Sequence, residues 1–528
     1  MDENNATAAQ RYEALTSPRD PFLRRARDCA VLTVPYLMPP AGFSASQTLE
    51  TPYQSLGARG VRTLSSKLLL SLFPPNTPFF RYQIDDQALQ KLTQQDGMRG
   101  TVETALSARE KAVLAEMESA IFRPVAFTCL QQLLTAGNVL LHIPEEGRCR
   151  AFRLDHFVVK RDASGNLLEI VIKETVAKTA LSDEVRVAIA DKVPTSPQGT
   201  ASEQKDLDLY TWIVRDKSMW KVHQEICGIQ VPGSDGSYKL DELPWLPLRL
   251  SVQPSEDYGR PYVEEYLGDL DSLEGLVEAI VEGSAATARV IFMVSPNGTT
   301  QMRVFAKART GDVISGDPND VGVVQTARHV DLSVARQQAQ DITQALAFAF
   351  MLNTAVQRSG ERVTAEEIRY MASELDDALG GVYTLLGAEF QLPAVRLFEK
   401  RMENNRKVQE LPKDLVQPQI VTGLQAIGRG YDQQNLKLFV SDIISVLGPE
   451  LAMQYLNASE FLKRSAASYG IDTGGLLLPE EQVAQNQQQA QLQQLIQQLG
   501  PQAISQLGGV AQTQMKTGAP VPQIQAPQ

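Results

Sequence analysis

The histidines and cysteines of this sequence are too scattered to form a recognisable chemical site. Zinc sites, disulfide frameworks and many nucleophilic sites place such residues at short, repeated spacings such as CxxC or HExxH. None of these residues lies at such a spacing from another: Cys29, Cys129, Cys149, Cys227, His142, His156, His223 and His329. We expect buried thiols in a reducing compartment, packed or surface histidines, and no metal ion.

Searches for phosphate-binding and nucleophile motifs are also negative. The sequence has no GxxxxGK[ST] loop, no GxGxxG fingerprint and no GxSxG elbow. Carboxylates are plentiful, but pairing them without a fold would be arbitrary. The residue types therefore favour an assembly or binding protein without a cofactor, and the alternative is an enzyme whose site has no local motif.

The charge balance restricts the partners of the chain. Its 528 residues carry 50 Lys and Arg against 62 Asp and Glu, a net charge of −12. Tight binding to nucleic acid depends on neutralised phosphates, so this balance disfavours a protein that grips DNA, although DNA can still pass close by. The acidic first residues do not resemble a signal peptide, and no apolar run approaches the roughly 18 residues of a membrane span, so we expect neither secretion nor a membrane.

The first half of the chain predicts a mixed α+β body. Apolar residues at helical spacing predict four helices, and alternating apolar residues around turn residues predict two β-hairpins. The helices span 6–37, interrupted by Pro18 and Pro21, then Tyr53–Phe73, Thr101–Phe122 and Val125–Thr135. The first hairpin runs from Phe152 through a turn at 162–166 to Val176, and the second runs from Leu209 to Ile226. Length and composition, with 43% apolar residues, predict about three or four structural units in all.

Charged residues on two of the predicted helices allow two readings each. Arg59, Arg62 and Lys67 on the second helix are either an anion site or, as is more usual, a solvated face. After Pro261, a long helix with an apolar stripe from Val263 to Ile280 carries only acidic charges on its other sides. These acidic residues are Glu264, Glu265, Asp269, Asp271, Glu274, Glu278 and Glu282. They form either a solvated face or a surface that does not adhere to a polyanion passing along it.

A small insert separates this helix from a second one. We expect Ser295 to begin the break, strands at Met302–Ala306 and Val321–Gln325, and a second helix from near Asp331 to Leu352. The sequence thus predicts a stalk of two long helices with a β-containing tip. Three basic residues of the tip could contact a partner or DNA, and an ordinary solvated face is the alternative. They are Arg303, Lys307 and Arg309.

A polar loop at 353–362 leads into a sharply defined helix start. The loop contains Arg358, Glu361 and Arg362. The start has a capping box and the hydrophobic staple that often accompanies it. The box is formed by Thr364 with Glu367, and the staple by Val363 with Ile368. This helix is expected to run to about Gln391, where Pro393 ends or kinks it.

The chain beyond this helix predicts a helical subdomain and a low-complexity tail. Helical spacing recurs over 413–427, 432–446, 450–457 and 459–469. Residues 481–528 are rich in glutamine and nearly uncharged, with several late prolines. Such a composition predicts disorder, except for an assembly-dependent helix at 482–499.

The order of these parts, together with four local runs, resembles the portal, or head-to-tail connector, proteins of short-tailed bacteriophages. The runs are Arg11-Tyr-Glu-Ala-Leu15, Thr51-Pro-Tyr-Gln-Ser-Leu-Gly-Ala-Arg-Gly60, Leu72-Phe-Pro-Pro-Asn-Thr-Pro-Phe-Phe80 and Arg362-Val-Thr-Ala-Glu-Glu-Ile368. The resemblance extends to about residue 480 and leaves out the glutamine-rich tail.

The resemblance implies a mainly helical α+β portal fold, assembled as a dodecameric ring at one capsid vertex. Double-stranded DNA would be packaged and ejected through the channel of this ring. The implied parts are a wing (1–257), a stem (258–294 and 330–352), a clip (295–329), a tunnel loop (353–363), a long kinked helix with more of the wing (364–411), a helical crown (412–480) and the tail (481–528).

The resemblance also implies partners and a location. The clip would dock the terminase large subunit during packaging and the tail adaptor afterwards. Scaffolding, major capsid and internal core proteins are further expected partners. Arg358 and Arg362 would lie near DNA as circles of positive charge, with Glu361 as a local counter-charge. The chain would be made in the bacterial cytoplasm and reside in the virion, and the alternatives are another phage structural or tail assembly protein or an enzyme without a motif.

Overall fold

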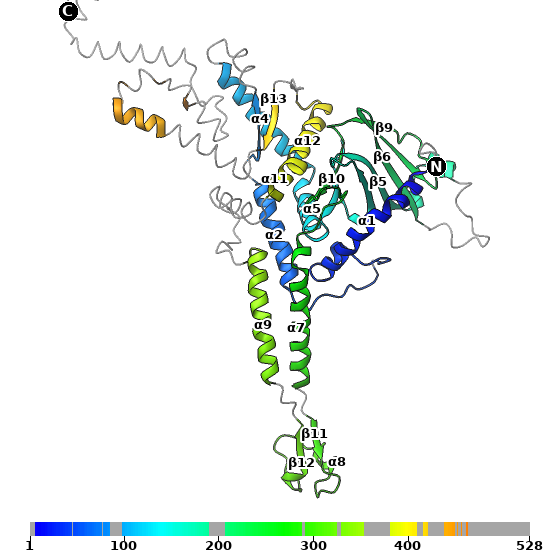
Figure 1. The fold of residues 1–528 in the computed structure, drawn as a ribbon, viewed down its shortest axis with the longest axis vertical. Helices are drawn as coiled ribbons and strands as arrows, with labels where there is room; N and C mark the ends of the chain where they lie inside the picture. The colour runs from blue at the N-terminus through cyan, green and yellow to red at the C-terminus, as the bar shows by residue number, and fades with distance from the viewer. Residues whose placement is uncertain are drawn as a thin grey trace, which may run out of the picture. The chain divides into compact units, whose positions relative to one another are not determined.

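The computed structural model describes residues 6–44, 46–75, 78–84, 98–189, 206–287, 291–324, 329–352, 381–408, 416–420 and 438–448, with single positions up to 462. The chain divides into two compact units. One is made of Met1–Ala88 and Ala108–Gly430, the other of Leu89–Ser107 and Tyr431–Gln528. Figure 1 gives the course of the chain, and the described residues mix helices with sheets, as predicted.

An antiparallel sheet of six strands forms the main β part of the first unit, in the order β4-β5-β6-β7-β8 with β9 paired to β7. Its strands are β4 (Phe157–Arg161), β5 (Leu167–Val176), β6 (Leu207–Asp216), β7 (Met219–Ile226), β8 (Ile229–Gln230) and β9 (Gly236–Lys239). The two predicted hairpins are the β4–β5 and β6–β7 pairs. The turn of the first is held by the Asp162 carboxylate, which accepts hydrogen bonds from the amides of Ser164 and Asn166.

The first hairpin begins later than predicted, because Phe152 belongs to a different sheet. That sheet has three strands, with β2 (Asn138–His142) between β3 (Arg150–Phe152) and β10 (Trp245–Arg249). A 3-10 turn at Leu154–His156 separates β3 from β4. Leu154 is fully buried in this turn, so its apolar side chain serves the core rather than a strand.

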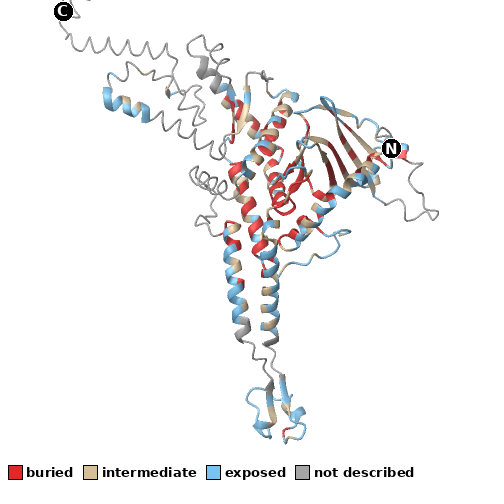
Figure 2. Cartoon of the chain, in the orientation of Figure 1, coloured by how far each residue is buried: buried red, intermediate tan, exposed pale blue. Residues whose placement is uncertain are grey.

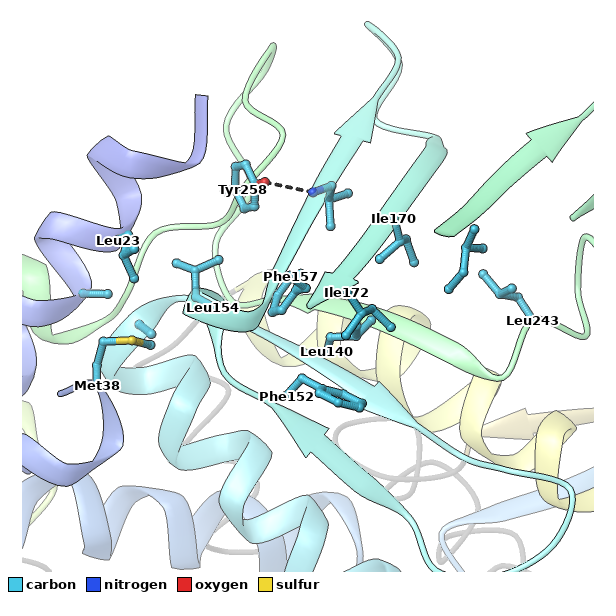
Figure 3. Close-up of a cluster of buried hydrophobic side chains, with 14 of the residues drawn as sticks. Leu23, Met38, Leu140, Phe152, Leu154, Phe157, Ile170, Ile172, Leu243 and Tyr258 are labelled. Atoms are coloured by element: carbon cyan, nitrogen blue, oxygen red, sulfur yellow. Dashed lines mark hydrogen bonds between the residues drawn. The ribbon is translucent and has the colours of Figure 1, made fainter. Parts of the chain in front are cut away.

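Helix α1 (Ala8–Val31) contacts strands β4 to β7 and closes the main hydrophobic core. Figure 3 shows Leu23 from this helix together with Phe157 and Ile170 from the sheet, all of them buried. Tyr258 is buried in the same cluster, and its hydroxyl accepts a hydrogen bond of 2.8 Å from the amide of Val159. The polar end of Tyr258 is therefore satisfied inside an apolar core.

Pro18 and Pro21 lie inside α1 without interrupting it, so the predicted break is wrong. Each proline lacks the amide that would donate to the preceding turn. Contacts with the sheet compensate for these lost hydrogen bonds. The buried Arg19 donates to the Tyr12 hydroxyl at 2.8 Å, and that hydroxyl donates to the carbonyl of Asp155 at 2.9 Å. Tertiary packing thus outweighs the local preference of proline.

Aromatic rings join several of the helical segments that follow the first helix, among which α4 extends into the second unit. The helical segments are α2 (Leu56–Leu72), α4 (Met98–Ser119), α5 (Phe122–Ala136), α11 (Gly381–Leu386), a π-helical turn (Gly387–Gln391) and α12 (Leu392–Asn404). The rings of Phe73, Phe122 and Phe390 meet edge to face, with 5.0 Å between the centroids of Phe73 and Phe390. Gln391 is fully buried, and its amide donates to the carbonyl of Leu72 at 2.5 Å.

The helix continues through Pro393, so the predicted outcome in which it ends there is wrong. A π-helical turn lies directly before α12, where an extra residue is accommodated. Beyond it, α12 is anchored by ion pairs, because Arg109 of α4 lies 2.7 Å from Glu399 and 2.8 Å from Glu403. These three side chains are largely buried, so their charges must stay paired.

The predicted helix at 413–427 is wrong where the structure describes it. Val416–Ile420 is strand β13, which pairs antiparallel with β1 (Phe80–Ile84). Pro418, in the middle of β13, has no amide to donate within a helix, and a two-stranded sheet tolerates it because each strand keeps a free edge.

Helix α7 (Leu267–Thr287) follows a 3-10 turn at Val263–Tyr266 and packs along α9 (His329–Ala349). The seam between them is the predicted apolar stripe: Leu270 and Leu273 are buried on α7, and Leu346 on α9. Figure 2 shows that most of each helix is exposed or intermediate and that buried positions are few.

The insert between α7 and α9 differs from the prediction in two places. α7 ends at Thr287 instead of 294, and Ile291–Val294 forms β11, which pairs with β12 (Val321–Val324). The segment expected as a strand is instead a single helical turn, α8 (Met302–Phe305). The β-branched ends of β11 suit a strand, whereas α8 has no strand to pair with among the described residues.

In the second unit, the described residues form the first part of α4 and a helix over 438–447, which agrees with the predicted helix at 432–446. The other predicted helices of that region and the tail at 481–528 lie outside the described residues. Among the described helices, none is both long and apolar enough to cross a membrane.

We expect Gly60→Ala to destabilise the first unit. A Cβ at Gly60 would lie 2.6 Å from the ring of Phe350, which is fully buried. Overpacking of this kind costs about 1–3 kcal/mol, against roughly 1 kcal/mol gained from helix propensity. Gly268→Ala is the matched control, because a Cβ at that helical position meets nothing within 4 Å. Thermal unfolding should show a lower Tm for Gly60→Ala than for Gly268→Ala, and equal values would contradict the close contact.

Candidate functional site

The predicted acidic surface of α7 is divided by the structure into two sets, and the first set binds the body of the unit. The Glu274 carboxylate accepts hydrogen bonds from the amides of Tyr53 at 2.7 Å and Gln54 at 3.1 Å, just before α2 begins. Glu264 lies 3.5 Å from Arg25 and 3.8 Å from Arg260. These two carboxylates therefore hold α1 and α2 beside the start of α7.

The second set is exposed and carries uncompensated charge. Its members are Glu265, Asp269, Asp271, Glu278 and Glu282. Within the part of the chain that the structure describes, none of them forms an ion pair. Like charges along one helix repel each other, so these carboxylates gain no stabilisation from one another.

The exposed side of α9 is almost uncharged, which sequence reasoning missed, and it carries the apolar Val334 and Phe348 together with polar residues. Its exposed residues include a run of glutamines: Gln337, Gln338, Gln340 and Gln344. Arg336 and Asp341 are exposed beside them with opposite charges. The helix pair thus presents an acidic surface on α7 and a nearly neutral surface on α9. The helical spacing of the glutamines was the sequence signal from which the neutral surface of α9 could have been predicted.

In the insert, Asp320 organises the loop that follows β11. Its carboxylate accepts hydrogen bonds from the amides of Thr299 at 2.7 Å and Thr300 at 3.1 Å, and from both hydroxyls at 3.2 Å. The bond from the Thr300 amide is the main reason why the pKa of Asp320 is lowered. A Cβ on Gly298 would lie 2.4 Å from this carboxylate, so only glycine fits there.

The predicted basic residues of the insert, Arg303, Lys307 and Arg309, are all exposed. They lie among large apolar side chains that are also exposed, which the sequence reasoning did not single out. These are Phe292, Met293, Met302, Val304, Val313 and Ile314. A two-stranded sheet is marginal by itself, and so much exposed apolar surface on one is typical of a contact site.

The end of α9 is fixed at the point where the predicted polar loop begins. Lys67 donates to the carbonyl of Met351 at 2.9 Å, and the Tyr262 hydroxyl donates to that of Ala349 at 2.9 Å. Lys67 is thus bound to a helix C-terminus, where a cation is favoured, rather than to an external anion. The loop residues and the helix cap lie outside the described residues: Arg358, Glu361, Arg362, Val363, Thr364, Glu367 and Ile368.

Two buried titratable groups in the described part of the chain are held by contacts with other side chains. A cleft of about 700 Å³ lies between the start of α1 and strands β4 to β6. Its buried carboxylate, Glu169, is already bound to Arg11 and Trp212 at 2.8 Å each. His142 is stacked on Trp245, and burial lowers its pKa to about 4, so it stays neutral. The described residues hold no group of three potential metal ligands.

The cysteines agree with the prediction at three of four positions. Cys29, Cys129 and Cys149 are buried, and burial raises the pKa of Cys29 to about 12 and that of Cys149 to about 11. Cys227 is exposed instead, because it lies in the tight turn between β7 and β8 with a φ of 52°. All four are free thiols.

Comparison with known proteins gives matches over most of the chain. The family model described as bacteriophage head to tail connecting protein matches residues 5–477. The portal protein of Escherichia phage T7 is 43% identical over 493 residues, which is 91% of this chain and 90% of that protein. The portal protein of Enterobacteria phage T3 is 40% identical over 527 residues, 98% and 96% of the two chains. That of Enterobacteria phage SP6 is 30% identical over 511 residues, 96% of each.

We expect the loop held by Asp320 to loosen in acid. A lowered pKa means that the carboxylate stabilises the loop above the pKa of an unfolded aspartate, about 4, and that this stabilisation is lost as the pH falls through the lower folded value. Hydrogen exchange, corrected for intrinsic rates, should show protection of the Thr299 and Thr300 amides at pH 7 and its progressive loss as the pH falls below the pKa of an unfolded aspartate. Asp320→Asn should be less protected at pH 7, and a pH dependence that survives this substitution would contradict the assignment.

Proposed function

We propose a function from the premise that this chain belongs to the family of bacteriophage head to tail connecting proteins. It forms a dodecameric ring at one vertex of the capsid. Double-stranded DNA enters and leaves through the channel of this ring, which also docks the proteins of the packaging motor and then of the tail. The family is one of structural portal proteins, and this chain acts as one, without an enzymatic step of its own.

The observation that carries this proposal is the pairing of α7 with α9. Two long helices joined along an apolar seam, with an acidic and a nearly neutral outer surface, suit the wall of a channel. A duplex passing such a wall is not held, because strong attraction needs basic residues that neutralise its phosphates. This helix pair would be the stem of the ring, with α7 ending at Thr287 and the clip beginning at Ile291.

The clip is proposed as the docking site for terminase and afterwards for the tail adaptor. Its exposed apolar side chains provide area to bury, and Arg303, Lys307 and Arg309 provide charge that can select an acidic partner. The sheet and helices up to residue 257, with α12, would form the wing, facing scaffolding and major capsid proteins. Residues 412–480 would form the crown, towards internal core proteins.

Contact with DNA is proposed for the loop that follows α9. Arg358 and Arg362, repeated around a ring, would give circles of positive charge at one level of an otherwise acidic wall, and Glu361 would moderate that charge. The described end of α9 supports this role, because bonds from Lys67 and Tyr262 hold the point from which the loop departs.

The assembly is tested by measuring the native mass of the purified protein and by imaging it end-on in the electron microscope. We expect a particle of about a dozen chains with a central channel, and no ATP hydrolysis by the ring alone, because the sequence has no phosphate-binding loop. A stable monomer at the same concentration, or ATP turnover that follows the ring through purification, would refute the proposal.

We expect charge reversal in the clip, Lys307→Glu with Arg309→Glu, to leave rings intact and to impair docking. Both residues are exposed, so the chain should fold normally, while a partner selected by their charge is repelled. In an infection that depends on the variant, DNA-filled or tailed particles should fall about tenfold. The control reverses two exposed bases of the wing, Arg148→Glu with Lys217→Glu, and an equal loss there would argue against a specific role of the clip.

A further inference from the structure

Two exposed arginines on α2 have no counter-charge among the described residues of their own chain. Arg59 and Arg62 are three residues apart and therefore lie on the same side of the helix. Neither forms an ion pair among the described residues. Lys67, the other base of this helix, is bound to the carbonyl of Met351. The sequence left open whether these charges form a site or a solvated face, and the structure separates the two arginines from the lysine.

Two exposed carboxylates at the start of α7 are likewise without an ion pair among the described residues. Glu265 lies in the 3-10 turn that leads into α7 and Asp269 lies in the first turn of α7, four residues later and on about the same side. They are members of the exposed acidic set, and no base among the described residues pairs with them. They lie away from Glu274, which faces the start of α2.

The two pairs of charges lie at the same levels along the helices. The bonds from Tyr53 and Gln54 to Glu274 place the start of α2 beside that residue. At 1.5 Å per residue, Arg59 and Arg62 lie about 8 and 12 Å further along α2 from Gln54. Asp269 and Glu265 lie about 8 and 14 Å before Glu274 along α7. Figure 1 shows that the axes of α2 and α7 lie roughly alongside each other and that the two helices run in opposite chain directions, so moving forward along α2 and backward along α7 leads to the same level.

We propose that these charges form a contact between neighbouring copies of this chain, Arg59 and Arg62 of one copy facing Asp269 and Glu265 of the next. This inference rests on the proposed ring. Rotation about an axis along the helices keeps every residue at its own level, so charges at equal levels on two sides of one chain can meet in adjacent copies. Each copy uses its basic side once and its acidic side once, which closes a ring without unpaired charge.

The alternative partner for the arginines is DNA, and the observations favour the protein. Contact with phosphates would explain Arg59 and Arg62 but would leave Glu265 and Asp269 without a role. A contact between copies explains the two arginines, the two carboxylates and the equal levels at which they lie. The two hypotheses predict different effects of reversing the charge of the arginines. A contact between copies predicts loss of ring assembly, whereas a contact with DNA predicts intact rings that fail to package DNA.

The test is to mix two variants whose charges are complementary. In Arg59→Glu/Arg62→Glu both sides of the chain are acidic, and in Glu265→Arg/Asp269→Arg both are basic. Each variant alone should form at least about tenfold fewer rings than the wild type at moderate salt, because every interface then pairs like charges. Mixed in equal amounts, they should form rings in which the two variants alternate, and native mass spectrometry reads both the count and the composition.

The matched control replaces other exposed acids of α7. Glu278→Arg/Glu282→Arg makes the same change of charge on the same helix, but about 14 Å or more from Asp269. Mixed with Arg59→Glu/Arg62→Glu, it should not restore rings. Circular dichroism establishes that each variant is folded, and Arg59→Gln/Arg62→Gln, which introduces no repulsion, should form fewer rings than the wild type if a reversed variant fails to fold.

The outcomes separate this inference from the proposed function. A wild-type protein that stays monomeric refutes the ring and the contact together. If the wild type forms rings and Arg59→Glu/Arg62→Glu forms as many, the proposed ring is supported and the proposed contact between copies is refuted. If such rings then fail to package DNA, the arginines face the duplex. If Arg59→Glu/Arg62→Glu loses its rings and mixing it with Glu265→Arg/Asp269→Arg does not restore them, the proposed pairing is also overturned.

Discussion

The buried contact between Phe350 and Gly60 is the constraint on which the helix pair depends. The ring of Phe350 fills the space that a side chain at residue 60 would occupy, and it meets the rings of Tyr262 and Tyr266 at 5.9 and 5.7 Å. Through these contacts the end of α9, the start of α7 and the middle of α2 share one small core. Packing at interior density leaves no room for them to slide independently.

Hydrogen bonds at the same junction hold the ends of α9 and α2 in the positions set by the apolar contact. The carbonyls at the end of α9 are bound by Lys67 and Tyr262, and the amides before α2 are bound by Glu274. These groups would otherwise remain without partners at helix ends. The junction therefore provides hydrogen-bond partners for backbone groups at the ends of α9 and α2 and aligns α7 with them. Packing and hydrogen bonding favour the same arrangement of the three helices.

Much of this organisation could be predicted from the sequence, and the failures have physical reasons. The stripe from Val263 to Ile280 predicted α7 because periodicity is a local property. The strand β13 was missed because its partner, β1, is more than 300 residues away in the chain, and local spacing there imitates a helix. Pro18 and Pro21 were misread because the sheet that stabilises α1 is assembled from distant segments.

The acidic residues of α7 show the same limit for the candidate site. Their sequence spacing gives one continuous acidic surface, yet Glu274 binds amides that are 220 and 221 residues away, and Glu264 lies beside Arg25. Contacts between distant segments decide which carboxylates bind within the chain and which remain available to another molecule. A local sequence pattern does not encode these contacts. The channel loop at 353–363 remains a prediction from the sequence alone.

The attachment of the helix pair near one end has a mechanical consequence. The hydrogen bonds that attach the helix pair to the rest of the unit lie around the first turns of α7 and the last turn of α9. The insert lies at the opposite ends, between the last turn of α7 and the first turn of α9. Twenty-one residues of α7 correspond to a lever arm of about 30 Å. A partner pulling sideways on the insert would thus exert a torque on the core around Phe350, and a small displacement there would be amplified at the tip.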